Sequence, residues 1–591
     1  MKLRKYQHEV ADSVFAAWKD GAKSTLVVMP TGTGKTVVFA SIIKRMFPKR
    51  VLVVANRQEL IWQARDKIQK VTGLTVDVEM GEHKARMEGD LLKPRAHVVV
   101  ATIQTLTSGG DGAGRMGRFD PMHYGAVVID EAHHAPGASY RKFIAYCQTN
   151  PNLKVLGVTA TPDRADEEAL GQIFETVAYD YEILDAIKDG WLVPIEQQMV
   201  SIESLDFSTI RTVAGDLNQA DLDAVMTSEK NLHGIASATI DIIGTKRGIG
   251  FASSVNHAQV LAHIFNRHKI GMAACVSAKT DKDERKKIIT DFAHGKIQWL
   301  WNCGVFTEGF DDSGVEVISM ARPTKSRALY AQMAGRATRP HETIAHRLNG
   351  VMVAPLRRAM IARSIKPGCL IVDFVGNSGK HKLMTTADIL GGNVSDEALD
   401  SAISLARKSG KPMRMDKTIE EEEKRIAEMK AKRLAEEARK AGLKGKATYK
   451  TQSIDPFDIF KIKPITKERD WDKGKVLSEG QRRILREKMG LNPDAYTYAQ
   501  ARQLLDAQFK VWNDAREKGF FPCTMKMVTL LKKHGVDAVG MPIEKGKLYI
   551  DAIAKNGWHK PAVMPEYHAL SDAAEPAGDT PEPFTSDDVP F

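Results

Sequence analysis

Residues 29–36 read Met-Pro-Thr-Gly-Thr-Gly-Lys-Thr, and this stretch decides the fold of the first part of the chain. The four residues before it, 25–28, are apolar or β-branched, which is typical of a buried parallel strand. Residues 37–47 predict a helix that ends before Pro48. A strand, a glycine-rich loop and a helix in this order predict a phosphate-binding loop.

The loop residues have the chemistry that a nucleoside triphosphate requires. Its glycines let backbone N–H groups turn inward and surround phosphate oxygens at the helix N-terminus. Lys35 is expected to reach the β- and γ-phosphates, and the Thr36 hydroxyl to ligate Mg²⁺. Met29 stands where such loops usually have their first glycine, so the pattern departs at one position. ATP and Mg²⁺ are the predicted ligands, and the expected nucleotide-binding loop residues are Thr31, Gly32, Thr33, Gly34, Lys35 and Thr36.

Length and composition exclude several classes of protein. A chain of 591 residues is too long for one core, and its 43% hydrophobic and 27% charged residues are typical of a globular protein. No apolar run reaches the length of a membrane span, so no membrane partner is expected. The five cysteines form no Cys-x-x-Cys pair, which argues against disulfides and a Cys-rich zinc site and suits the cytoplasm. The net charge of +11 favours a polyanionic partner.

Strand-like runs recur after the loop with helical segments between them, at 51–54, 98–100, 126–129 and 155–158. This alternation predicts a parallel sheet with helices on both faces. A polar cluster follows each run, and the carboxyl ends of parallel strands share one edge of a sheet. We therefore expect the four clusters to line one site.

Two carboxylates follow the third of these runs. Asp130 is expected to hold Mg²⁺, and Glu131 to orient and deprotonate the attacking water. Near the N-terminus, Gln7 is a candidate reader of adenine, because an amide can hydrogen-bond both N6 and N7 of that base. Catalysis of ATP hydrolysis is the chemistry that this set of residues predicts.

These segments resemble motifs of the superfamily 2 helicases of the DEAH type. Residues 33–36, 130–133 and 159–161 resemble motifs I, II and III of that family. The resemblance implies that His133, Thr159 and Thr161 couple hydrolysis to strand movement. It also implies contact with a nucleic-acid backbone through the residues of motifs Ia and Ib, which are Arg57, Gln58, Thr102 and Gln104.

The resemblance implies a second sheet domain, and expected strands follow at 248–252, 272–276, 297–301, 315–320 and 369–375. Residues 307–311 resemble motif V, which implies a nucleic-acid contact for Thr307 and nucleotide contacts for Gly309 and Asp311. Residues 332–339 resemble motif VI, with Gln332, Arg336 and Arg339 as candidate catalytic residues. The two arginines are three residues apart, so they are expected on one side of a helical turn, where a guanidinium can stabilise charge at the γ-phosphate.

Residues 3–377 most resemble the RadD-like and type III restriction Res-subunit branch, found in bacteria and phages and mostly acting on DNA. Two features of that branch are missing. No Cys-rich zinc module is present, and no nuclease-like carboxylate cluster follows residue 380. The resemblance thus implies a DNA motor without a nuclease.

The expected organisation is α/β, with two tandem RecA-like domains of parallel sheet and helices followed by a helical C-terminal region. The predicted parts are a first RecA-like domain (1–195), a second (196–380), a linker with a charged helical spacer (381–464), a small helical domain (465–555) and a disordered acidic tail (556–591). The charged spacer suits either a solvated helix or a coiled-coil or DNA-tracking arm.

In the helical domain, Ser478-x-x-Gln481 and Thr497-x-x-Gln500 are capping-box patterns that predict two helix starts. A third helix is expected from about Thr524 to Gly535. Basic residues concentrate at the start of this domain, and either a nucleic-acid patch or an ordinary exposed helix face explains them.

The chain ends in Asp-Asp-Val-Pro-Phe, residues 587–591, which is similar to the acidic tip of bacterial single-stranded-DNA-binding proteins. The resemblance implies a protein partner that captures Phe591 and its α-carboxylate in an apolar pocket with a basic rim. A solubilising acidic tail is the alternative interpretation.

The function predicted from all of these features is an ATP-dependent DNA helicase of a bacterial cell or phage-infected host, with DNA favoured over RNA. A translocase that moves on duplex or branched DNA would use the same residues. An adaptor with weak ATPase activity, which recruits partners through its acidic tip, is a third hypothesis.

Overall fold

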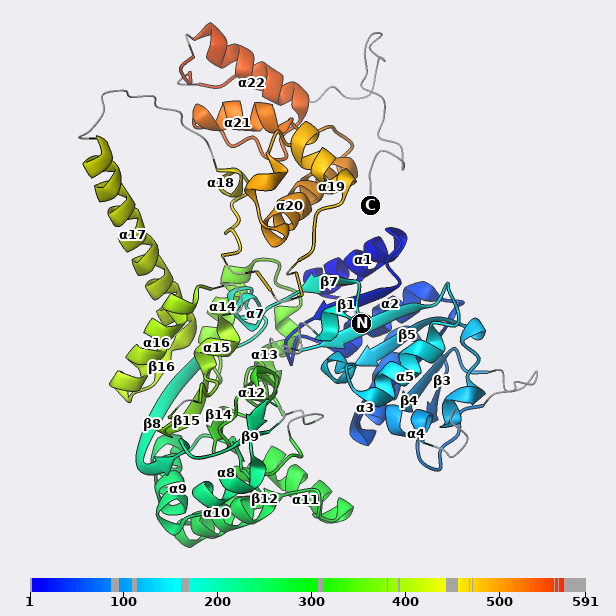
Figure 1. Ribbon diagram of the computed structural model, residues 1–591, viewed down its shortest axis with the longest axis vertical. Coiled ribbons are helices and arrows are strands. Elements are labelled where there is room, and N and C mark those ends of the chain that lie inside the picture. Colours follow the sequence, from blue (N-terminus) through cyan, green and yellow to red (C-terminus); the bar gives the residue numbers. More distant parts are fainter. Residues whose placement is uncertain are drawn as a thin grey trace. The chain divides into compact units, whose positions relative to one another are not determined.

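The computed structural model describes residues 3–86, 95–108, 114–160, 169–213, 215–306, 310, 312–379, 381–391, 394–442, 455–466, 468–469, 471–472, 474–556, 558–561 and 563–567. The chain separates into two units, Met1–Lys430 and Ala431–Phe591. The first unit contains two parallel sheets with their helices, and the second unit is helical (Figure 1). The predicted fold class is confirmed.

The first sheet has seven strands in the order β3-β4-β2-β5-β6-β1-β7, and every pairing is parallel. All five residues of its strand β1 are buried, so both faces of the sheet are covered, as expected for parallel strands. The strands are β1 (Ser24–Val28), β2 (Arg50–Ala55), β3 (Val76–Glu79), β4 (Val98–Thr102), β5 (Tyr124–Asp130), β6 (Lys154–Thr159) and β7 (Thr176–Asp180).

The helices of this domain connect the strands and carry their apolar residues inward. In α1, for example, Val10 and Val14 are spaced by one turn and both are fully buried. The helices are α1 (Lys5–Lys19), α2 (Lys35–Met46), α3 (Gln58–Thr72), α4 (Ile103–Thr107), α5 (Ala138–Cys147) and α7 (Ile183–Lys188). Short 3₁₀ turns occur at Gly114–Arg118, Pro121–His123 and Ala132–His134.

The second sheet has the order β12-β13-β11-β14-β15-β8-β16, parallel except for the edge strand β16. Its strand β11 holds glycines because the Trp299 and Trp301 rings of the neighbouring strand occupy the space of their side chains. A Cβ at Gly250 would lie 2.1 Å from the Trp301 ring. The strands are β8 (Ile195–Asp206), β11 (Gly248–Phe251), β12 (Ala273–Val276), β13 (Trp299–Asn302), β14 (Val317–Met320), β15 (Cys369–Asn377) and β16 (Met413–Arg414).

Seven helices and a small antiparallel ribbon complete the described part of this domain up to residue 377. The helices are α8 (Gln219–Met226), α9 (Glu229–Ile243), α10 (Val255–His268), α11 (Lys282–Ala293), α12 (Arg327–Ala334), α13 (Glu342–Leu348) and α14 (Ala354–Ala362). The ribbon consists of β9 (Thr212–Val213) and β10 (Asp216–Leu217).

Residues 381–464 contain more packed helix than the linker with a short helix and the charged spacer that the sequence predicts there. The first half of this stretch forms α15 (Thr386–Leu390) and α16 (Asp396–Ser409), whose buried residues belong to the same core as the sheets. The charged helix α17 (Met415–Gly442) also packs at its start, where Met415 and Ile419 are buried. The start of the expected spacer is therefore part of the first unit. The polar composition of this stretch does not predict the buried stripe of α16, because that stripe consists mainly of the small residues Ala398, Ala402 and Ala406.

The second unit forms its own apolar core. Both predicted capping boxes are present, at the starts of α19 (Glu479–Arg483) and α20 (Tyr498–Glu517). The third predicted helix is α21 (Met525–Lys533), capped by Thr524. The unit also contains α18 (Pro456–Phe460), a π-helical turn (Ile484–Lys488), a 3₁₀ turn (Pro493–Ala495) and α22 (Ile543–Lys555).

No helix of the described residues is long and apolar enough to cross a membrane. The acidic tip at 587–591 lies outside the described residues, as does Lys473, one of the basic residues at the start of the helical domain. Among the other basic residues there, Arg482 forms an ion pair with Asp494, while Arg483 and Arg486 are exposed.

Candidate nucleotide and nucleic-acid site

The loop between β1 and α2 leads directly into a helix N-terminus. Gly32 and Gly34 have φ angles of 88° and 89°, in the left-handed region that favours glycine. The helix begins at Lys35, so its first N–H groups have no partner within the helix and are available to an anion. The Thr33 hydroxyl donates to the Pro30 carbonyl at 2.7 Å and holds the turn. Met29, the departure from the usual pattern, is fully buried in the core.

The acid pair lies at the carboxyl end of β5, opposite this loop. Lys35 Nζ is 3.2 Å from Glu131 Oε1, and both side chains are about nine-tenths buried. Glu131 has φ 49° and ψ 55°, a conformation that residues with side chains rarely adopt outside functional sites. Asp130 Oδ1 accepts the Glu131 N–H at 3.0 Å.

The charge state of Glu131 follows from its surroundings. Burial alone would raise the pKa of Glu131, but the positive charges of Lys35, His133 and Arg336 outweigh burial and lower it. Within the described residues, Glu131 Oε2 accepts no hydrogen bond, and His133 Nδ1 lies 3.6 Å away. An ionised carboxylate with one unused, buried oxygen is suited to hold and deprotonate a water molecule.

His133 joins the two sheet domains. Its Nδ1 is 3.1 Å from the hydroxyl of Thr159, the last residue of β6. Its Nε2 is 3.4 Å from the Gln332 Nε2 of α12. The two motifs of the first domain and the glutamine of the second domain therefore meet at one imidazole. Thr161 lies outside the described residues.

The residues of motif VI reach the phosphate-binding loop. A Cβ on Gly335 would lie 2.8 Å from Thr31 Cβ, and a Cβ on Gly32 would lie 2.8 Å from Arg339 Cγ. Arg336 donates to the Phe310 carbonyl at 2.6 Å and is buried. Both arginines follow Ala334, the last residue of α12, so they lie just past the helix and not on a helical turn within it. The glycines at 32 and 335 allow the two backbones to approach this closely.

Gln7 is buried against the same loop. Its Nε2 donates to the Thr33 carbonyl at 3.0 Å, and its Oε1 accepts the Arg4 N–H at 3.0 Å. A Cβ on Gly34 would lie 2.7 Å from this Nε2. Both ends of the amide thus contact the protein, and the glutamine supports the loop.

An aromatic cluster beside Gln7 was missed from the sequence. The Tyr6 hydroxyl donates to the Thr33 carbonyl at 2.6 Å, and its ring stacks on Tyr181 at 4.9 Å. The guanidinium groups of Arg4 and Arg357 lie 4.4 and 4.2 Å from the Trp191 ring. Trp191 belongs to the sequence Gly-Trp-Leu-Val-Pro, residues 190–194, and a tryptophan flanked by glycine and proline was the only local sign of this cluster.

One of the two motif Ia residues, Arg57, contacts the second domain in this structure. Arg57, the cap of α3, donates to the Gly304 carbonyl at 3.0 Å, and the next residue, Gln58, is exposed. Glu59 forms an ion pair with Arg285 at 3.7 Å.

The motif Ib residues differ in exposure. Thr102 is buried and caps α4, where its hydroxyl oxygen accepts the Thr105 N–H, whereas Gln104 is exposed and donates to the Asn56 carbonyl at 3.0 Å. Thr307, Gly309 and Asp311 of motif V lie outside the described residues.

Comparison with known families accords with this geometry. Residues 1–164 match the family "Type III restriction enzyme, res subunit", and residues 235–341 match the "Helicase conserved C-terminal domain". These two stretches of the chain therefore resemble the corresponding domains of restriction-enzyme Res subunits and of helicases.

Three curated relatives have sequences similar to this chain over part of their length. The chain is 30% identical over 418 residues to IRC3 of Saccharomyces cerevisiae, named as an ATP-dependent helicase, covering 68% of this chain and 55% of the relative. It is 29% identical to a 51.5 kDa protein of a Lactococcus phage, covering 55% and 65%. It is 28% identical to the DNA 3'-5' helicase XPB of Kineococcus radiotolerans, covering 57% of each. The chain thus spans less than two thirds of the length of these relatives.

Proposed function

We propose that this protein is a nucleic-acid-stimulated ATPase that couples ATP hydrolysis to the separation of DNA strands. The observation that carries the proposal is the meeting of the two domains at the candidate site. Gly335 lies against Thr31 of the phosphate-binding loop, and Gln332 lies 3.4 Å from His133. A site completed by two domains links hydrolysis to their relative movement.

The residues around the loop suit ATP with Mg²⁺. Lys35 exchanges its ion pair with Glu131 for the phosphates, and Thr36 and Asp130 are the oxygen donors for the metal. The metal neutralises phosphate charge when it is bound. Glu131 then orients and deprotonates water through the oxygen that no described residue uses.

Arg336 and Arg339 supply positive charge from the second domain. A guanidinium beside the transferred phosphoryl group stabilises the charge of the transition state, an effect of about 10³–10⁵ in rate in other nucleotide hydrolases. Arg336 and Arg339 belong to the second domain, whereas the phosphate-binding loop belongs to the first. The arginines therefore act only while the two domains are in contact, and Gly335 permits that close approach. Gln7 positions the loop with one N–H and one lone pair of its amide, and the remaining N–H and lone pair read adenine.

DNA is the proposed track. Two relatives support this choice through their names, a DNA 3'-5' helicase and a type I restriction endonuclease subunit. The net charge of +11 favours a phosphate backbone. The residues proposed to contact that backbone are Arg57, Gln58, Thr102, Gln104 and Thr307. Of these, the buried Thr102 acts through the cap of α4.

The first test measures ATP hydrolysis by the wild type and by Lys35→Ala, alone and with single-stranded, duplex or forked DNA or RNA. Stimulation by one polymer that is lost in Lys35→Ala supports the motor. Preference for single strands or forks supports strand separation, whereas preference for duplex DNA identifies a translocase. Hydrolysis near zero with every polymer contradicts both.

We also propose that Phe591 docks on a protein partner through the acidic tip. Deletion of Asp587 to Phe591 is expected to abolish recovery of partners in pull-down from a bacterial lysate. Substitution of Asp587 and Asp588 by Asn, with Phe591 retained, separates charge from the aromatic anchor. Unchanged recovery after deletion contradicts the docking proposal.

A further inference from the structure

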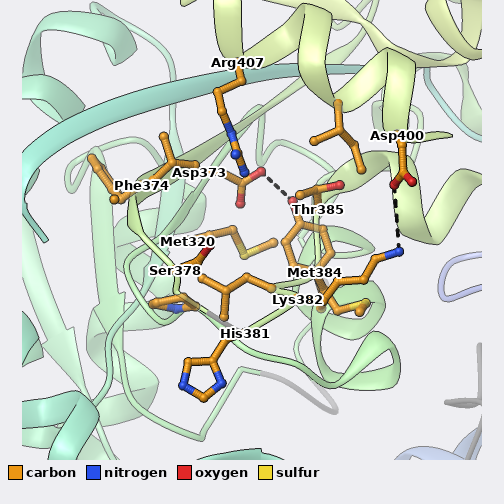
Figure 2. Close-up of a pocket in the computed structure, with 16 residues that line it drawn as sticks. Met320, Asp373, Phe374, Ser378, His381, Lys382, Met384, Thr385, Asp400 and Arg407 are labelled. Atoms are coloured by element: carbon orange, nitrogen blue, oxygen red, sulfur yellow. Dashed lines mark hydrogen bonds and ion pairs between the residues drawn. The ribbon is translucent and has the colours of Figure 1, made fainter. Parts of the chain in front are cut away.

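A cavity of about 360 Å³ lies at the carboxyl ends of β14 and β15, and none of its lining residues belongs to the phosphate-binding loop (Figure 2). Its walls are largely apolar and come from these strands, from α16 and from the segment 381–385. Met320, Phe374 and Ile403 are among the lining residues. The volume lies in the usual range of small-molecule sites, which are mostly apolar with a few polar groups.

A buried carboxylate faces this cavity. Asp373 is 7% exposed, and its Oδ2 accepts the Tyr330 hydroxyl at 2.7 Å and the Gln197 Nε2 at 2.5 Å. Among the described residues, no group donates to Oδ1 of Asp373. Because Tyr330 and Gln197 hold Oδ2 in place, the second oxygen has a fixed direction. A ligand with an N–H group would supply the missing donor.

The carboxylate is ionised at neutral pH. Burial raises the pKa of Asp373 to about 6, against the two donors, and Asp388 adds to the rise. Above that pH the cavity therefore contains a negative charge with one unused oxygen. Such a group favours ligands that donate hydrogen bonds.

The rim of the cavity carries two cations, Arg407 and Lys382, and one carboxylate, Asp400. Arg407 of α16 and Lys382 are both exposed, and Figure 2 shows Arg407 extending into the site from the helix above. The Lys382 side chain is 60% exposed, with its Nζ 3.9 Å from Asp388 and 4.0 Å from Asp400. Because the carboxylates of Asp388 and Asp400 offset the charge of Lys382, Arg407 is the cation of the rim that best suits a phosphate group.

We propose that this cavity binds a nucleotide whose base carries an amino group. The base enters between the apolar walls, its amino N–H donates to Asp373 Oδ1, and its phosphate contacts Arg407 and Lys382. Cytosine, adenine and guanine have such an amino group. Thymine presents carbonyl oxygens beside its single N–H, and the carboxylate repels them.

The nucleotide belongs either to a bound DNA strand, with one base turned out of the stack, or to a free mononucleotide. Only the strand source depends on the proposed motor function. Both sources share the same recognition chemistry, so one substitution tests both.

Asp373→Asn is the decisive variant. Tyr330 and Gln197 would hold the amide oxygen, so the amide NH₂ would face the cavity and replace an acceptor by a donor. Wild type is expected to bind cytosine forms about tenfold or more tightly than thymine forms, and the variant to reverse the order. The full chain is titrated with labelled oligodeoxycytidylate or oligothymidylate, and separately with dCMP or dTMP while ADP saturates the phosphate-binding loop.

Each outcome is decisive. A reversed preference confined to oligonucleotides identifies a strand base, and a reversed preference with mononucleotides identifies a free nucleotide. Equal binding of both bases by wild type, or an unchanged preference in the variant, overturns the proposal. The motor proposal fails separately, through absent ATP hydrolysis.

A second variant covers the case in which Asp373→Asn does not fold. Arg407→Ala is expected to weaken both bases several-fold without changing their ratio, because the arginine contacts the phosphate. Lys408→Ala on the same helix is the matched control, since this lysine is exposed and does not line the cavity. Equal effects of the two variants contradict the site.

Discussion

At the scale of the residue, Glu131 stands out because its backbone, charge and partners are all unusual. Its left-handed φ aims the side chain between Lys35 and His133. The neighbouring positive charges keep it ionised although it is buried. The adjacent carboxylates were readable from sequence, but this conformation was not, because strain depends on surrounding packing.

Glu131→Gln is expected to reduce ATP hydrolysis by about 10²–10⁴-fold while nucleotide affinity changes little, because the amide keeps the volume but is no base. Steady-state hydrolysis and equilibrium nucleotide binding measure the two effects. Since neighbouring positive charges lower the pKa of Glu131 below its ordinary value, the carboxylate is ionised at neutral pH, and its protonation does not reduce activity there. Exposed Glu203→Gln is the control. Undiminished hydrolysis in Glu131→Gln would refute the assignment.

Gly335→Ala tests the contact between the domains. The added Cβ would lie 2.8 Å from Thr31 Cβ and 2.9 Å from the Ala331 carbonyl, so the turn cannot keep its place. The turnover number is expected to fall about tenfold or more, with little change in nucleotide affinity. Gly350→Ala is the matched control, because its nearest neighbour would be 3.6 Å away. Equal turnover numbers for the two variants would show that this approach is unimportant.

At the scale of the element, local signals were reliable where they act through the backbone nearby. The capping boxes at Ser478 and Thr497 were predicted and are present, because a cap depends on residues three positions apart. The strand β8 was missed. Its sequence alternates with polar residues, and it becomes a strand by pairing in parallel with β15, far along the chain.

Helix α16 is a second example, because the polar composition of this region predicted a linker with only a short helix. Ala402 is fully buried there, so Ala402→Glu would place an unpaired charge in the core and is expected to cost roughly 3 kcal/mol or more. Thermal unfolding measures the loss. Ser404→Glu, on the exposed side of the same helix, should have little effect. A stable Ala402→Glu protein would mean that α16 does not pack as described.

At the scale of the whole molecule, Arg57 combines a contact between the two sheet domains with a positive charge available to DNA. It bridges to Gly304 in the second domain and is also proposed to contact DNA. Binding to single-stranded DNA is expected to weaken with salt, and Arg57→Ala to reduce the slope of log K against log salt by about 0.7. Arg363→Ala, an exposed arginine after α14, is the control. An unchanged slope in Arg57→Ala would place the backbone contact elsewhere.

The sequence by itself determined the phosphate-binding loop, the acid pair and the alternation of strands and helices, because these depend on residues close together in the chain. Only the tertiary structure decided which residues of the second domain meet the loop. Gly335 lies against Thr31, and Gln332 against His133, across some 200 to 300 positions of sequence. The cavity around Asp373 also required the fold, because its donors, walls and rim come from separate elements. Packing between residues far apart in the sequence selects these partners. Local periodicity does not predict them, because it depends only on residues close together in the chain.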